Sequence, residues 1–86
     1  MIIIEIDSVE GEISECPDAY MDGDVAINSF GSGQYTVLIQ LPWGITISDF
    51  KVACDLEYKS SGRGPGAARK AFAFYKAVVK RLKGRA

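Results

Sequence analysis

The last 28 residues of the chain, 59–86, read KSSGRGPGAARKAFAFYKAVVKRLKGRA. This stretch holds nine basic residues and no acidic residue. Pro65 suits the first turn of a helix, because its missing N–H would have no partner there. Apolar residues then recur at the three- and four-residue spacing of an amphipathic helix. The stretch therefore predicts a glycine-rich turn followed by a helix from about Ala67 to Lys83.

The two sides of this predicted helix differ in chemistry. One broad side is apolar and should pack across a sheet. It consists of Ala68, Ala71, Phe72, Tyr75, Val78, Val79 and Leu82, with Phe74 at its margin. The opposite stripe carries Arg69, Lys76, Lys80 and Lys83. Cations near the helix end are also favoured by the helix dipole, so part of this charge has a structural explanation.

The preceding part of the chain has the opposite charge. Residues 1–58 contain all eleven carboxylates and a single base, Lys51. The formal net charge of −1 therefore combines an acidic segment of −10 with a basic segment of +9. Such segregation indicates a surface that binds a partner of opposite charge.

Length and composition indicate a small soluble protein. A chain of 86 residues forms one domain, here 1–86, and 48% hydrophobic with 24% charged residues is typical of globular proteins. No apolar run approaches the roughly 18 residues that span a bilayer, and the N-terminus lacks the pattern of a signal peptide. We expect a cytoplasmic protein that does not contact a membrane.

The acidic segment contains several strand patterns. Met1–Asp7 alternates isoleucines with other residues and predicts a strand, whereas residues 9–15 fit either a short strand or a turn. Residues 16–24 are rich in turn residues and predict an acidic loop. Residues 25–30 and 34–41, joined by Gly31-Ser32-Gly33, predict a hairpin.

A further period-two pattern follows the hairpin. Residues 50–59 alternate apolar with mostly charged side chains, which predicts another strand and places Cys54 toward the core. Only one helix pattern is present in this interpretation. The expected fold class is therefore α+β, with a three- to five-stranded, mainly antiparallel sheet packed by one C-terminal helix.

The sequence offers little material for catalysis or metal binding. It has no histidine to act as a base near neutral pH, and it has neither a nucleophile-elbow serine nor a nucleotide-binding P-loop. Cys16 and Cys54 alone are too few for a zinc site, and we expect both to be reduced thiols. The aspartates of residues 16–24 do not have the spacing of a calcium-binding loop. We expect a protein that is not an enzyme and that uses no cofactor or metal.

Binding residues are better represented. The basic candidates are Arg63, Arg69, Lys70, Lys76, Lys80 and Lys83. The glycine-rich turn before the helix could hold an anion at the helix N-terminus, or it could simply be a connector that reverses the chain. Trp43, the only tryptophan, follows a strand and precedes Gly44. It could be a partly buried anchor at the core edge or a contact residue for a partner.

A family resemblance covers residues 50–82. The pattern Phe50-x-Val52-x-Cys54-x-Leu56, then Gly62-x-Gly64 and an alanine-rich basic helix, resembles the last strand and last helix of a double-stranded RNA-binding domain. The resemblance implies binding of duplex RNA phosphates through Arg69 and Lys70. In its small size, many acidic residues and lack of catalytic motifs, the chain is also similar in style to phage-encoded inhibitors such as anti-CRISPR proteins.

Three functional hypotheses follow from these observations. The first is a nucleic-acid-binding protein that neutralises phosphates with the basic turn and helix. The second is a phage-type inhibitor or adaptor that binds a protein of nucleic-acid machinery, through either its basic helix or its acidic strands and loops. In the third, the two charged zones neutralise each other, within one chain or between the subunits of a homodimer.

Overall fold

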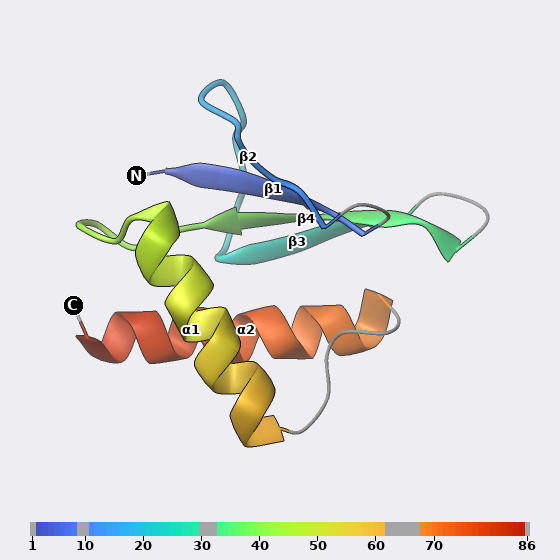
Figure 1. The fold of residues 1–86 in the computed structure, drawn as a ribbon. Helices are drawn as coiled ribbons and strands as arrows, with labels where there is room; N and C mark the ends of the chain where they lie inside the picture. The colour runs from blue at the N-terminus through green and yellow to red at the C-terminus, as the bar shows by residue number, and fades with distance from the viewer. Residues whose placement is uncertain (1, 9–10, 30–32, 62–67, 86) are drawn as a thin grey trace.

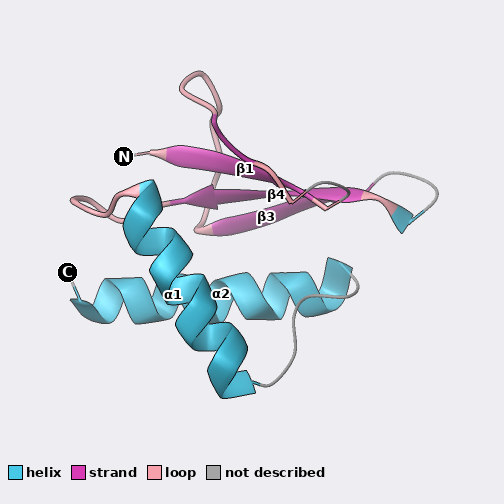
Figure 2. Ribbon diagram, in the orientation of Figure 1, coloured by secondary structure: helices cyan, strands magenta, loops and turns pink. Residues whose placement is uncertain are grey.

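The computed structural model describes residues 2–8, 11–29, 33–61 and 68–85. In this part of the chain, four strands form one antiparallel sheet, and two helices lie on the same side of it (Figure 1). Figure 2 shows this division into a sheet layer and a helix layer. The fold class is α+β, as the sequence predicts, but two helices rather than one pack on the sheet. Neither described helix is long and apolar enough to cross a membrane.

The sheet has the strand order β2-β1-β4-β3. Strand β1 spans Ile3–Asp7, β2 spans Ile13–Glu15, β3 spans Val25–Ser29 and β4 spans Tyr35–Gln40. The N-terminal strand and the β3–β4 hairpin confirm the sequence predictions. Of the segment 9–15, for which a short strand and a turn were both open, residues 13–15 form the strand β2, and residues 9 and 10 lie outside the described part. Residues 31 and 32 of the hairpin connection lie outside the described part.

Strand alternation divides the sheet into a buried face and an open face. Across the three longer strands, Ile4 lies opposite Ile39, which lies opposite Val25, so all three side chains point to the helices. The neighbouring row, with Glu5 opposite Leu38, faces away from the helices. The sheet therefore buries one side and leaves the other to solvent, as is usual for antiparallel sheets.

The segment that the sequence predicts as a strand at residues 50–59 is helical. It belongs to helix α1, Ile47–Ser61, so the strand prediction is wrong. Its first turn is fixed by a reciprocal cap, in which the Asp49 backbone N–H donates to Thr46 Oγ1 at 3.1 Å and the Thr46 N–H donates to Asp49 Oδ2 at 3.0 Å. This Thr-x-x-Asp arrangement is a capping box, and it satisfies donors that a helix start leaves unpaired.

Burial along α1 follows helical spacing. Phe50 and Ala53 are completely buried, and Cys54 packs against the core with partial exposure. Val52 and Leu56, which a strand would have turned inward with Phe50, are 53% and 45% exposed. The same residues that resemble the last strand of a double-stranded RNA-binding domain are therefore part of a helix in this protein.

Helix α2, Ala68–Arg85, supplies the largest part of the helix layer. It packs beneath β3 and β4, and α1 crosses it (Figure 1). Its buried side consists of Ala71, Val78, Val79 and Leu82, with Phe74 and Tyr75 partly buried beside them. The predicted apolar side is thus largely confirmed, although Phe72 is 39% exposed at its edge.

Two further contacts hold the helices together. The Phe50 ring of α1 stacks on the Tyr75 ring of α2, with centroids 6.1 Å apart. Arg81 of α2 donates to Glu57 of α1 at 3.0 Å, forming an ion pair near the surface. The aromatic contact supports the crossing of α1 over α2, and the ion pair adds a smaller contribution near the surface.

The helical placement of α1 predicts different costs for two truncations on it. Phe50→Ala should lower the free energy of unfolding by about 3–5 kcal/mol, because it leaves a cavity in the core. Val52→Ala should change it by less than about 0.5 kcal/mol, because this side chain is exposed. Urea denaturation of both variants measures the difference. Equal losses from the two substitutions would contradict the helix and support a strand that buries both residues.

Candidate functional site

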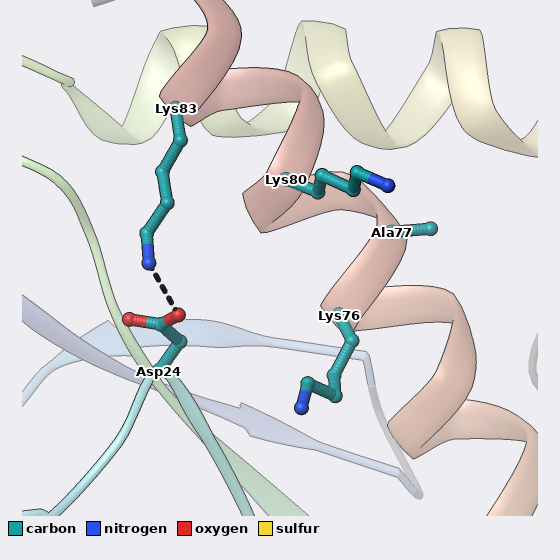
Figure 3. Close-up of a pocket in the computed structure, with 5 residues that line it drawn as sticks. All are labelled: Asp24, Lys76, Ala77, Lys80 and Lys83. Carbon is teal, nitrogen blue, oxygen red and sulfur yellow. Dashed lines mark hydrogen bonds and ion pairs between the residues drawn. The ribbon is translucent and has the colours of Figure 1, made fainter.

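A basic stripe runs along the exposed side of α2. Lys76, Lys80 and Lys83 succeed each other at spacings of four and three residues, so they lie on one side of the helix. With Ala77 and Asp24 they line a shallow hollow of about 330 Å³ (Figure 3). The apolar side of α2 is fixed against the sheet, and this fixes the direction of the stripe. We call Lys76, Lys80 and Lys83 the basic stripe.

One lysine of the basic stripe is paired with a carboxylate. Lys83 Nζ donates to Asp24 Oδ2 at 2.6 Å, and both side chains are about half exposed (Figure 3). Asp24 immediately precedes β3, and its backbone carbonyl accepts a hydrogen bond of 2.9 Å from the Gln40 N–H. The backbone therefore holds Asp24 in position. An exposed pair of this kind contributes at most about 1 kcal/mol to stability, so a stronger anion can compete for Lys83.

The other two lysines of the basic stripe form no ion pair within the described residues. Lys76 Nζ lies 5.3 Å from the centre of the Phe72 ring, a cation–π contact that orients its side chain without neutralising it. Lys80 is exposed, and within the described residues neither it nor Lys76 has an ion pair with a carboxylate. The stripe is therefore a net cationic surface with one internal counterion, Asp24.

Trp43 is presented by a tight turn after β4. The Ile45 N–H donates to the Pro42 carbonyl at 3.2 Å, and Gly44 has a φ of 80°. A positive φ at the third position is what a type II turn requires, and it explains the glycine there. Trp43 occupies the second position, and 75% of the residue is exposed. The ring does not serve as a partly buried anchor of the core edge.

The turn and the basic stripe meet at Asp24. A second hollow, of about 390 Å³, is lined by Trp43, Pro42, Gln40, Gly23, Asp24 and Lys83. It shares Asp24 and Lys83 with the hollow of the basic stripe. The structure thus places an exposed aromatic ring at one end of a row of lysines, with the Lys83–Asp24 ion pair between them.

The structure describes the other basic residues selected from the sequence only in part. Arg69 and Lys70 belong to the first turns of α2, but their side chains are not described. Arg63 and the glycine-rich turn, including the proposed anion site at the helix N-terminus, lie outside the described residues.

Sequence reasoning missed the role of Asp24. It counted this residue only as part of an acidic loop, yet Asp24 pairs with a lysine 59 positions away. Arg81 and Glu57 form a second pair across 24 positions. No local pattern indicates such partners. Each of these contacts pairs a cation of the basic segment with a carboxylate of the acidic segment. For these two cations, the charged zones neutralise each other within one chain, as in the third hypothesis.

The described part of the chain has no group of three or more histidine, cysteine, aspartate or glutamate residues that could hold a metal ion. Cys16 and Cys54 are free thiols. Burial, with a smaller contribution from the charge of Asp55, raises the pKa of Cys54 from 9.0 to about 12. Burial also raises the pKa of Tyr75 to about 12, with smaller contributions from Cys54 and Tyr35. Both groups are therefore fully protonated at neutral pH.

Comparison with known proteins adds no relative to this picture. No protein-family model, curated protein or solved structure matches the chain.

The raised pKa of Cys54 predicts slow alkylation in the folded protein. The thiolate is the reactive form, so at pH 8 native Cys54 should react with iodoacetamide at least tenfold more slowly than in urea. Peptide mass spectrometry over time measures both rates. Burial also makes the folded state favour the protonated thiol. The contribution of this preference to the free energy of unfolding is complete below pH 9 and is lost as the pH rises from 9 toward 12. Equal rates with and without urea would contradict the burial of this thiol.

Proposed function

We propose that the protein is a non-enzymatic binding protein that contacts nucleic acid, or a similar polyanion, through the basic stripe of α2. The observation that carries this proposal is the alignment of Lys76, Lys80 and Lys83 on one exposed side, where Lys83 alone pairs with a carboxylate of the described residues. At 1.5 Å per residue, the stripe extends about 10 Å along the helix. Rows of cations on this scale bind phosphates and release the counterions around them.

The distribution of the acidic residues supports the same proposal. Glu5 lies between the buried Ile4 and Ile6 on β1, so it belongs to the face of the sheet that points away from the helices. Glu57 of α1 is occupied by Arg81. Local charge, rather than the net charge of −1, therefore governs the field at the basic stripe.

Arg69 and Lys70 would extend the contact toward the start of α2. Arg69 precedes Lys76 by seven residues, which is about two helical turns, so its backbone lies on the same side of the helix. Lys70 and Arg63 would add charge before it. These three residues remain part of the proposal as additional phosphate contacts.

Neutralising the stripe should weaken binding and reduce its dependence on salt. For Lys76→Gln/Lys80→Gln, the slope of log affinity against log salt should fall by about 0.7 per lysine on a single strand, or about 0.9 on a duplex. Fluorescence anisotropy of labelled oligonucleotides between about 50 and 200 mM salt measures the slope. Lys51→Gln/Lys59→Gln on α1 removes the same charge elsewhere and should leave the slope nearly unchanged.

Asp24→Asn is the companion variant of opposite sign. It removes the internal counterion and frees Lys83, so affinity should rise several-fold in the same assay. Affinity that does not change with salt would contradict the proposed contact, and so would an equal loss of affinity in the α1 control. Weaker binding by Asp24→Asn would contradict the role of Asp24 as a counterion that competes with the ligand for Lys83.

A second candidate function is a protein-binding inhibitor or adaptor, acting on a protein of nucleic-acid machinery. The observation that favours it is the exposure of Val52 and Leu56, which are one turn apart on α1. Adjacent exposed apolar side chains are typical of contact surfaces between proteins.

The two functions respond to different substitutions. Val52→Ser/Leu56→Ser should release a bound protein partner in a cross-linking pull-down, whereas it should leave oligonucleotide affinity within about twofold. Thermal unfolding should confirm that this variant remains folded, because both side chains are exposed. A pull-down that yields no protein, together with tight oligonucleotide binding, would count against the inhibitor function.

A further inference from the structure

We infer that the polyanion at the basic stripe is single-stranded nucleic acid, one base of which stacks on Trp43. This inference rests on the proposed function and specifies the form of the nucleic acid. Its basis is the position of an exposed tryptophan at the end of a row of lysines. This combination of stacking ring and backbone-tracking cations is how single strands are commonly bound.

A tight turn presents Trp43 to solvent. The turn between Pro42 and Ile45 is closed by a backbone hydrogen bond and by the positive φ of Gly44. The residues on either side are anchored. Leu41 is completely buried and its N–H donates to the Ile2 carbonyl at 2.8 Å, and Ile45 packs against the core. A large aromatic residue that is 75% exposed on a fixed turn provides a preorganised flat surface.

The surface beside Trp43 is continuous with the basic stripe. The hollow beside Trp43 and the hollow of the basic stripe share Asp24 and Lys83. In Figure 3, Lys76, Lys80 and Lys83 all emerge from α2, and the Lys83 side chain reaches across to Asp24. A strand that follows this surface therefore passes from the ring to Lys83 and then to Lys80 and Lys76.

The charges along this path determine where a base and where the phosphates are favoured. The carboxylate of Asp24 lies next to Lys83 and repels a phosphate at that point. Lys76 and Lys80 are farther along the stripe and have no carboxylate partner among the described residues. Phosphates are therefore favoured at Lys76 and Lys80, whereas a base, which carries no charge, is favoured at Trp43.

Access to the face of a base distinguishes a single strand from a duplex. In a duplex both faces of each internal base are covered by its neighbours, so a ring on the protein surface reaches a base face only after unstacking it. In a single strand the base faces are available without this cost. Because every base has such a face, the contact should depend little on base sequence.

The experiment uses Trp43 as its own probe, since the chain contains one tryptophan. Short oligothymidylate should quench Trp43 fluorescence in a saturable manner, and anisotropy of the labelled strand should give the same affinity. An abasic strand of equal length should bind at least fivefold more weakly and should not quench. A duplex of the same length should also bind more weakly at equal salt.

Two variants test the ring itself. Trp43→Ala should weaken binding of the single strand about tenfold, whereas Trp43→Phe, which keeps an aromatic face, should lose less than about threefold. Neither change should unfold the protein, because the side chain is exposed. The salt slope should be the same in both variants, because no cation is removed.

Other outcomes separate this inference from the function on which it rests. Salt-sensitive binding that ignores the Trp43 substitutions, or equal affinity for the abasic strand, would overturn the stacking and leave the proposed function intact. Failure of every oligonucleotide to bind in a salt-sensitive manner would overturn both. Polyglutamate that binds as tightly as the single strand and quenches Trp43 would identify an acidic peptide instead, and would overturn the inference.

Discussion

The packing of α2 on the inner face of the sheet is the interaction on which the other features depend. Val78, Val79 and Leu82 are buried against the same core as Ile4 and Ile39. Burying side chains of this size contributes about 1.5–3 kcal/mol each, far more than an exposed ion pair. With the apolar side fixed in this way, helical geometry leaves the lysines no direction except outward. The position of the basic stripe is therefore a consequence of core formation rather than of attraction between charges.

Local interactions explain which parts of the fold could be predicted from the sequence. The β3–β4 hairpin and α2 have clear periodicity over adjacent residues, and both were predicted. Residues 50–59 have two periodicities at once, because Phe50 and Cys54 fit either alternation or a helical turn. The capping box at Thr46 and Asp49 was the signal that favoured a helix, and the period-two pattern obscured it. A strand and a helix placed there bury different residues, so this error also hid the exposure of Val52.

The sequence predicts the basic residues and Trp43 of the candidate site, but not how they are arranged in space. Lys76, Lys80 and Lys83 are spaced by four and three residues, so the sequence alone places them on one face of a helix. The contact between Lys83 and Asp24, and the approach of Trp43 to the same place, depend on how α2 lies relative to β3 and to the turn after β4. These elements are distant in the chain, and nothing in their local sequences encodes the distance between them. The proposed site is therefore a product of tertiary structure.

The strand order places β3 at one margin of the sheet, where the outer N–H and C=O groups have no neighbouring strand in the described structure. Such a margin can template the addition of strands from other molecules. α2 packs against β3 and carries its lysines beside the start of that strand. Two copies that approached through this margin would bring Lys76 and Lys80 of each copy closer together, and the repulsion between like charges would oppose such pairing.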